Sequence, residues 1–191
     1  MATIIFVTGT GTEVGKTVVT AGLLQCLRRL GHRAVAVKPI QTGCRRLEDD
    51  MLEPLDLRDY ARFESADTEL DANADQSEFA TQPEPIELVC PYRFEPACSP
   101  HLAAAMAGVT IDPERIMTSV RQLAGRYDVV LVEGAGGVLV PIGDGRTMLD
   151  LAVALGGPVV LVADNRLGCI NHTLLSVGEI RAAGLECAGI V

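Results

Sequence analysis

The sequence contains no tryptophan and few other aromatic residues. Aromatic side chains make up 4% of the 191 residues, whereas 48% of the residues are hydrophobic. The core must therefore be mainly aliphatic, and the length suits one domain with a sizeable core. No apolar run approaches the roughly 20 residues that cross a bilayer. Because the sequence has neither a basic leader nor a cleavage-type spacer, we expect no signal peptide, no membrane partner and a cytoplasmic protein.

Closely spaced cysteines and clustered basic residues are also missing. The six cysteines are scattered without a Cys-x-x-Cys pair, which argues against a zinc site and a disulfide framework. No basic stripe indicates nucleic-acid binding. The net charge of −9 is uneven, because residues 48–87 hold fourteen acidic residues against two arginines. The acidity therefore belongs to one segment and not to the whole surface.

Lysine is nearly absent. Sixteen residues are Lys or Arg, and the only lysines are Lys16 and Lys38. A sequence that uses arginine wherever any cation will serve should keep lysine where a compact, mobile ammonium is needed. Both lysines fall in segments that have features of phosphate sites, so we interpret both as functional.

Apolar runs alternate with segments of helical periodicity. Runs typical of buried parallel strands occur at 4–7, 34–37, 129–132, 159–162 and 188–191. Helices are expected at 16–30, 55–63, 100–106, 113–124, 148–155 and 170–183, from their spacing and capping residues. This order predicts an α/β fold with a mainly parallel open sheet and helices on both faces. We expect one domain over 1–191 with an acidic, loop-rich insertion at about 44–90. The final run stops in mid-strand, and we expect the natural chain to be longer.

Residues 8–17, TGTGTEVGKT, follow a predicted strand and open a predicted helix. This is the context of a phosphate-binding P-loop, in which backbone N–H groups and the helix N-terminus face phosphate oxygens. Lys16 is expected to reach the β- and γ-phosphates, and Thr17 to bind Mg²⁺. The motif departs from its usual form, because Thr10 stands where the first glycine is expected. ParA- and MinD-like ATPases carry a signature lysine where this sequence has Gly11, which argues against those partitioning switches.

Two further segments are predicted to end at the same edge of the sheet. Lys38 follows the strand 34–37, and a second cation beside a P-loop suits charge on an acceptor or a transferring phosphoryl group. Glu133 ends the strand 129–132, in the arrangement in which an acidic residue at a strand tip holds Mg²⁺. The Gly-Ala-Gly-Gly sequence after Glu133 lets a ligand approach the backbone closely.

Five motifs follow one another along the chain, namely GTGTEVGKT at 9–17, KPxxTG at 38–43, SPH at 99–101, EGAGG at 133–137 and LGCINH at 167–172. In their order and context they resemble the dethiobiotin synthetase family. The resemblance spans residues 4–191 and is weakest over 44–90. It implies a P-loop cyclo-ligase that uses ATP and Mg²⁺. In that reaction 7,8-diaminononanoate takes up CO₂ as a carbamate, ATP phosphorylates the carbamate, and the second amine closes the ring of dethiobiotin.

The resemblance also implies a set of site residues. Lys16 and Lys38 would be catalytic, and Thr17, Glu133 and Asp56 would hold the metal, with Asp59 as the alternative to Asp56. ATP contacts would come from Gly11, Thr12, Glu13, Val14, Gly15, Lys16, Thr17, Asp56, Glu133, Gly134, Ala135 and Gly136. Substrate contacts would come from Thr12, Thr42 and Asn171, the last across a homodimer interface. The family's adenine-reading Asn would follow Val191.

Two other classes of function remain open from the sequence. A cobyrinate-type amidoligase or a small-molecule kinase would share the Gly-Lys-Thr loop, but would lack the motifs around Lys38 and Ser99 together. A non-catalytic nucleotide switch would need a hydrolysing or partner-sensing element, and Gly11 argues against the best-known kind.

Overall fold

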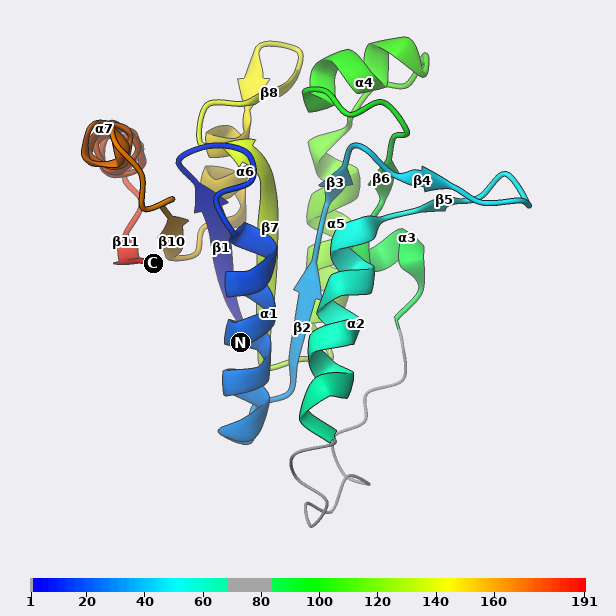
Figure 1. Ribbon diagram of the computed structural model, residues 1–191, viewed down its shortest axis with the longest axis horizontal. Helices are drawn as coiled ribbons and strands as arrows, with labels where there is room; N and C mark the ends of the chain where they lie inside the picture. The colour runs from blue at the N-terminus through cyan, green and yellow to red at the C-terminus, as the bar shows by residue number, and fades with distance from the viewer. Residues whose placement is uncertain (1, 69–83) are drawn as a thin grey trace.

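The computed structural model describes residues 2–68 and 84–191, without the side chains of 62–68. Its centre is a five-stranded parallel sheet in the order β11-β10-β1-β7-β2 (Figure 1). The strands are β1 (Thr3–Gly9), β2 (Ala34–Val37), β7 (Val129–Gly137), β10 (Val159–Val162) and β11 (Cys187–Ile190). The predicted fold class is confirmed. Both β1 and β7 continue beyond the apolar runs, 4–7 and 129–132, from which they were predicted.

Helices cover both faces of the sheet. Figure 1 shows α1 (Lys16–Arg29) and α2 (Leu55–Thr68) in front of it, with α5 (Pro113–Ala124) and α6 (Met148–Leu155) behind. The helix α7 (Cys169–Ala182) connects β10 to the edge strand β11. Successive residues of β7 serve the two faces, because side chains alternate along a strand. Leu131 belongs to the cluster with α1, and its neighbours Val130 and Val132 to the cluster with α5 and α6.

Short elements surround the carboxyl ends of the strands. They are β3 (Ile40–Gln41), β4 (Arg45–Arg46), β5 (Leu52–Glu53), α3 (Ile86–Val89), β6 (Tyr92–Arg93), α4 (Pro100–Met106), β8 (Pro141–Gly143) and β9 (Arg146–Thr147). β3 pairs in parallel with β6, so the segment after β2 is held by the segment before α4.

The segment expected to be loop-rich is more regular than predicted. β4 and β5 form an antiparallel hairpin, and α2 continues to Thr68 instead of ending at residue 63. The sequence of the hairpin shows no apolar alternation from which it could be predicted. An ion pair between Arg45 and Glu53 at 2.7 Å joins its two strands instead. Residues 69–83 of the predicted insertion lie outside the described residues, and its last part contains α3. Over the described ranges, no helix is both long and apolar enough to cross a membrane.

Candidate nucleotide and acceptor site

The carboxyl edge of the sheet brings three sequence motifs together. In the strand register Val7 of β1 lies beside Glu133 of β7, and Val37 of β2 lies beside Val132. The P-loop that follows β1, the lysine that follows β2 and the carboxylate of β7 are therefore neighbours. Ligands of open α/β sheets bind at this edge.

Glycine gives the P-loop its path. Gly15 precedes α1 with φ of +96°, a left-handed conformation that favours glycine. A Cβ on Gly9 would lie 2.6 Å from Cγ2 of Val14, so the loop folds too closely over this position for any side chain. The glycine that the usual motif places at position 10 is therefore required one residue earlier in this chain.

The two P-loop side chains predicted to contact phosphate and metal face the cavity. Lys16 is buried, and its Nζ donates to the carbonyl oxygen of Gly11 at 2.6 Å. Burial, followed by repulsion from Lys38, lowers the pKa of Lys16 to about 8. The hydroxyl of Thr17 donates to Oε1 of Glu133 at 3.1 Å. The start of α1 is thereby tied to the carboxylate of β7.

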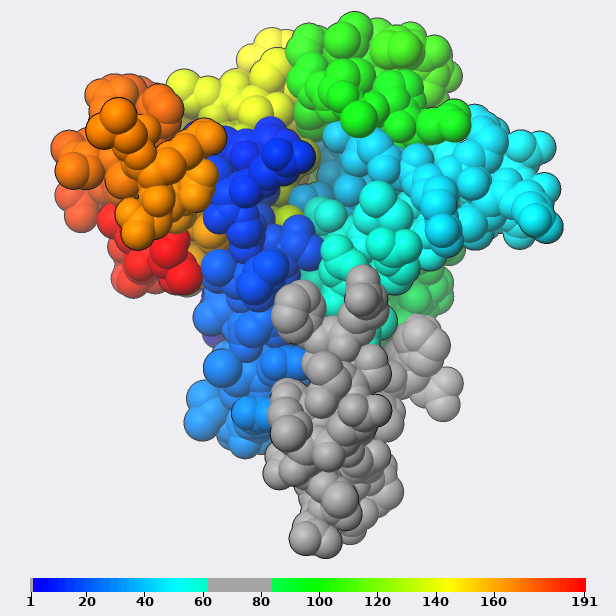
Figure 2. All heavy atoms as spheres, in the orientation of Figure 1, coloured from blue at the N-terminus to red at the C-terminus, as the bar shows by residue number. Residues whose placement is uncertain are grey.

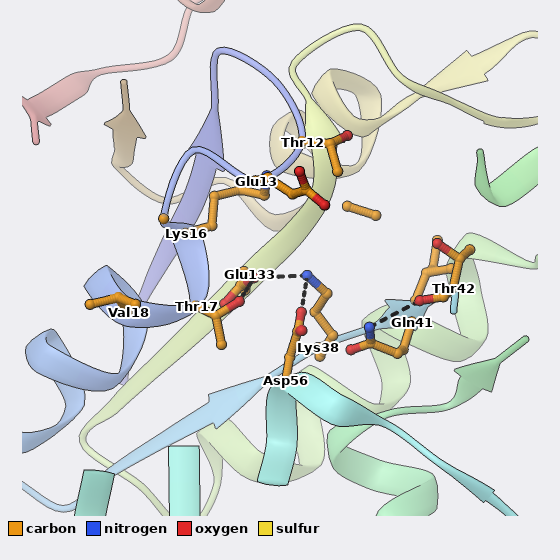
Figure 3. Close-up of a pocket in the computed structure, with 14 residues that line it drawn as sticks. Thr12, Glu13, Lys16, Thr17, Val18, Lys38, Gln41, Thr42, Asp56 and Glu133 are labelled. Atoms are coloured by element: carbon orange, nitrogen blue, oxygen red, sulfur yellow. Dashed lines mark hydrogen bonds and ion pairs between the residues drawn. The ribbon is translucent and has the colours of Figure 1, made fainter. Parts of the chain in front are cut away.

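Lys38 lies at the centre of the site. Its Nζ contacts Oδ2 of Asp56 at 2.6 Å and Oε1 of Glu133 at 2.7 Å (Figure 3). It also donates to the carbonyl oxygen of Gly134 at 3.3 Å. Burial opposes the charged form, but attraction to Glu133 and Asp56 raises the pKa of Lys38 above its ordinary value. The buried ammonium is therefore a persistent cation beside the P-loop.

Tyr60 is a member of the site that the sequence analysis missed. Its hydroxyl donates to Oε2 of Glu133 at 2.5 Å, and both side chains are buried. Burial, together with the charge of Glu133, raises the pKa of Tyr60 well above its ordinary value, so the phenol remains a donor. Tyr60 lies four residues after Asp56 in α2, and residues at this spacing share a helix face. That spacing was the available signal.

The structure separates the two aspartates that were predicted as alternatives. Asp56 lines the cavity and binds Lys38. Asp59 is not among the cavity-lining residues that the structure describes, and its Oδ1 lies 3.9 Å from Nε of Arg58. The geometry therefore favours Asp56 as the acidic residue of α2 in the site.

A cavity of about 350 Å³ joins these groups. In Figure 2 the P-loop (blue) lies at the surface beside the start of α2 (cyan). Most of the predicted residues line this cavity, namely Thr12, Glu13, Gly15, Lys16, Thr17, Lys38, Thr42, Asp56, Glu133, Ala135 and Gly136. Val18, Ile40 and Gln41 line it as well, without having been predicted.

Four predicted residues lie elsewhere. Gly11 and Gly134 meet the site through carbonyl oxygens that accept from Lys16 and Lys38, respectively. The side chain of Val14 packs with Val7 and Val162, so only its backbone remains to face a ligand. Asn171 is exposed near the start of α7 and does not line this cavity. Its role across a subunit interface stays a prediction.

The oxygen groups fit a magnesium ion that arrives with phosphate. Oγ1 of Thr17 and Oε1 of Glu133 are 3.1 Å apart, close to the edge of about 3 Å in an octahedron of Mg–O bonds of about 2.1 Å. No cluster of three or more His, Cys, Asp or Glu side chains suited to a metal occurs among the described residues. Thr17, Glu133 and Asp56 would thus hold Mg²⁺ together with phosphate oxygens, as is usual for this ion.

A parallel sheet flanked by helices, with a Gly-Lys-Thr loop between β1 and α1, defines a P-loop NTPase domain. A family model described as "AAA domain" (AAA_26) matches residues 3–191. The chain belongs to this family of P-loop NTPases, which includes dethiobiotin synthetase.

Solved structures show the same fold. The septum site-determining protein MinD of Pyrococcus horikoshii, complexed with Mg-ADP, is 24% identical with a TM-score of 0.54 over 100% of this chain and 69% of its own. The kinase domain of the Escherichia coli tyrosine kinase ETK is 15% identical with a TM-score of 0.53, over 98% of this chain and 66% of its own. A Borrelia burgdorferi plasmid partition protein is 13% identical with a TM-score of 0.54, over 100% and 77%. The chain thus spans about two thirds of the kinase and MinD structures.

Proposed function

We propose that the protein is an ATP- and Mg²⁺-dependent cyclo-ligase of the dethiobiotin synthetase type. The observation that carries this proposal is a second lysine in the P-loop cavity. Lys38 lies between Asp56 and Glu133, in the same cavity as Lys16 and Thr42. Nucleotide binding alone needs one cation at the phosphates. A second buried cation suits an acceptor that is itself an anion, such as a carbamate.

The proposed reaction begins at the first amine of 7,8-diaminononanoate. Its nitrogen forms a bond to CO₂ and releases a proton, which gives the carbamate. A carbamate oxygen then attacks the γ-phosphorus of ATP, the bond to the β-phosphate oxygen breaks, and ADP leaves. The second amine finally attacks the carbonyl carbon of the mixed anhydride and loses a proton, and phosphate departs with the bonding electrons and takes up that proton as the cyclic urea closes.

The residues of the cavity divide these tasks. Lys16 would neutralise the γ-phosphate, and Lys38 would stabilise the carbamate and the negative charge of the phosphoryl group in transfer. Thr17, Asp56 and Glu133 would hold Mg²⁺, which neutralises the β- and γ-phosphates when bound. Thr12 and Thr42 would orient the substrate from opposite sides of the cavity. We propose a homodimer as the active form, with Asn171 reaching the neighbouring subunit's substrate.

A coupled ADP-release assay tests the proposal. With 7,8-diaminononanoate, bicarbonate, ATP and Mg²⁺ present we expect ADP release, and omission of any one component should abolish it. Mass spectrometry should find one dethiobiotin for each ADP. ADP release at the same rate with and without the diamine, or ADP release without formation of dethiobiotin, would reject this function in favour of another P-loop activity.

A further inference from the structure

The cavity contains a buried hydrogen-bond acceptor that the described residues leave without a donor. Gln41 lines the cavity beside Thr42 and is only 7% exposed. Its Nε2 donates to the carbonyl oxygen of Thr42 at 3.1 Å, whereas its buried Oε1 receives no hydrogen bond within the described part of the chain. Buried polar atoms in folded proteins nearly always have a partner, so this oxygen requires an explanation.

The backbone fixes where this side chain stands. Gln41 is in β3, which pairs with β6, and its carbonyl oxygen accepts from the backbone N–H of Phe94 at 2.8 Å. In Figure 3 the amide group of Gln41 lies between the side chains of Lys38 and Thr42, on the side of the cavity away from Thr12 and Glu13. An amide held in this position presents its oxygen at the acceptor side of the cavity.

The partner of Oε1 must bring an N–H or O–H group. In the reaction proposed above, neither the γ-phosphate of Mg²⁺-bound ATP nor CO₂ carries such a donor at neutral pH. The nucleoside of ATP does, but in-line transfer places the acceptor and the leaving nucleotide on opposite sides of the γ-phosphate. The amines of the acceptor substrate remain as donors on the side where Gln41 lies.

We propose that Gln41 is a specificity-determining residue whose amide oxygen accepts a hydrogen bond from one amine of the diamine. This inference rests on the proposed function, because it takes the diamine as the acceptor substrate. The interaction selects a substrate that has an N–H donor at that position. A site built to accept such a bond discriminates strongly against an analogue that lacks the donor, because its own polar atom is then left unpaired.

Ligand-binding calorimetry in the presence of Mg²⁺ and a non-hydrolysable ATP analogue tests the proposal. The ligands are the diamine and the two monoamines, 7-aminononanoate and 8-aminononanoate. Gln41→Met, which keeps the length but removes the acceptor, should raise the Kd of the diamine about 10-fold or more. The penalty should vanish for the monoamine that lacks the contacting amine, and nucleotide affinity should be unchanged. Gln41→Glu, which keeps an acceptor oxygen, should preserve the discrimination between the monoamines.

The outcomes separate this inference from the proposed function. Equal Kd values for the wild type and Gln41→Met, or an equal penalty for all three ligands, would overturn the role of Gln41 while diamine turnover by the wild type continued. Loss of the discrimination in Gln41→Glu would also count against it, and decides the matter should Gln41→Met fail to fold. A wild type that neither binds nor turns over the diamine would overturn both. Gln122→Met, on the exposed side of α5, is the matched control and should bind all ligands as the wild type does.

Discussion

At the scale of single residues, a shared cation explains how the site holds two carboxylates close together. Asp56 and Glu133 both lie within 2.7 Å of one ammonium, so neither has to be buried as an unpaired charge. The same ammonium would meet the carbamate and the transferring phosphoryl group. Lys38 therefore neutralises buried carboxylates in the folded protein, and in the proposed reaction it is also catalytic.

Replacement of Lys38 should separate turnover from nucleotide binding. We expect Lys38→Ala to lower kcat by about 10²-fold or more, because a charge contact is lost in the transition state. The Kd for ATP should change much less. Lys38→Arg should not restore kcat, because a planar guanidinium cannot replace a compact ammonium between two carboxylates. Steady-state kinetics with calorimetry checks this, with the exposed Arg45→Ala as the control. Wild-type kcat in either Lys38 variant would make this lysine merely structural.

The lowered pKa of Lys16 predicts proton uptake when ATP binds. With a pKa of about 8, the free Lys16 is mostly charged at pH 7 and mostly neutral at pH 9. The triphosphate favours the charged form and raises this pKa, so at pH 8.5 binding should draw a proton from the buffer. ATP affinity should accordingly fall as the pH rises above about 8. Calorimetry in buffers of different ionisation enthalpy measures the uptake.

The control for this titration is Lys16→Arg, which stays charged at every relevant pH. Its ATP binding should take up no proton at pH 8.5, whatever its affinity. An uptake equal to that of the wild type would assign the proton to another group.

Much of the residue-level site could be read from the sequence. Lys16, Thr17, Lys38 and Glu133 could be found because each lies where a predicted strand ends or a helix begins, and the structure places all four together. Tyr60 and Gln41 could not be found in this way. The spacing of four residues from Asp56 places Tyr60 on the same helix face, but it does not reveal the hydrogen bond to Oε2 of Glu133. For Gln41, no local sequence pattern indicates that its Oε1 is buried without a donor.

At the scale of the elements, α2 contributes to the site although it belongs to the long segment between the sheet strands β2 and β7. It packs against α1 with Tyr60 in the cluster that contains Leu24 and Leu131. Its first turn supplies Asp56 to Lys38, and the next turn supplies Tyr60 to Glu133. One face of α2 thus provides Asp56 and, through Tyr60, orients Glu133, the two acidic residues of the proposed metal site.

Removal of the Tyr60 hydroxyl should make the position of the Glu133 carboxylate less fixed without creating a cavity in the core. In Tyr60→Phe the ring still fills its place, but Oε2 of Glu133 loses its donor. Partners that orient metal ligands typically contribute 10- to 100-fold to metal affinity. We expect the Mg²⁺ concentration for half-maximal ADP binding to rise about 10-fold, with little change in metal-free ADP binding. Calorimetry at several Mg²⁺ concentrations provides the measurement.

Tyr127→Phe is the matched control for this substitution. Its hydroxyl donates to Glu84 at 2.9 Å, a contact outside the cavity lining. Each variant should lose about 1.5–3 kcal/mol of stability, because each loses a hydrogen bond to a carboxylate. Only Tyr60→Phe should change the Mg²⁺ requirement, and an equal shift in both variants would argue against a positioning role for Tyr60.

The elements also show where prediction from sequence ends. The strands β2 and β10 were predicted at their observed bounds, as were the helices α4, α5 and α6, because their apolar runs and capping residues are local signals. The hairpin β4–β5 and the pairing of β3 with β6 were not found. An ion pair between Arg45 and Glu53 joins β4 to β5. Contacts between segments about 50 residues apart join the region of β3 to that of β6, such as the hydrogen bond from the backbone N–H of Cys44 to the carbonyl oxygen of Phe94.

At the scale of the whole molecule, α7 carries an apolar stripe on its outer side. Leu167 before the helix and Ile170 and Leu174 within it are 105%, 73% and 66% exposed. Spacings of three and four residues place them along one side. Figure 2 shows α7 (orange) standing out beside the P-loop. Exposed apolar surface of this kind is typical of interaction sites.

This stripe provides a direct test of the proposed homodimer. Light scattering on a sizing column should find twice the chain mass for the wild type. Leu174→Arg should give a monomer, because two charged side chains would have to be buried at a symmetric interface. Leu30→Arg, at an exposed position just after α1, should remain a dimer. If substrate lies near the interface, monomeric Leu174→Arg should bind ATP normally but lose most of its kcat/KM for the diamine. A monomeric wild type, or a dimer that persists in Leu174→Arg, would contradict association through α7.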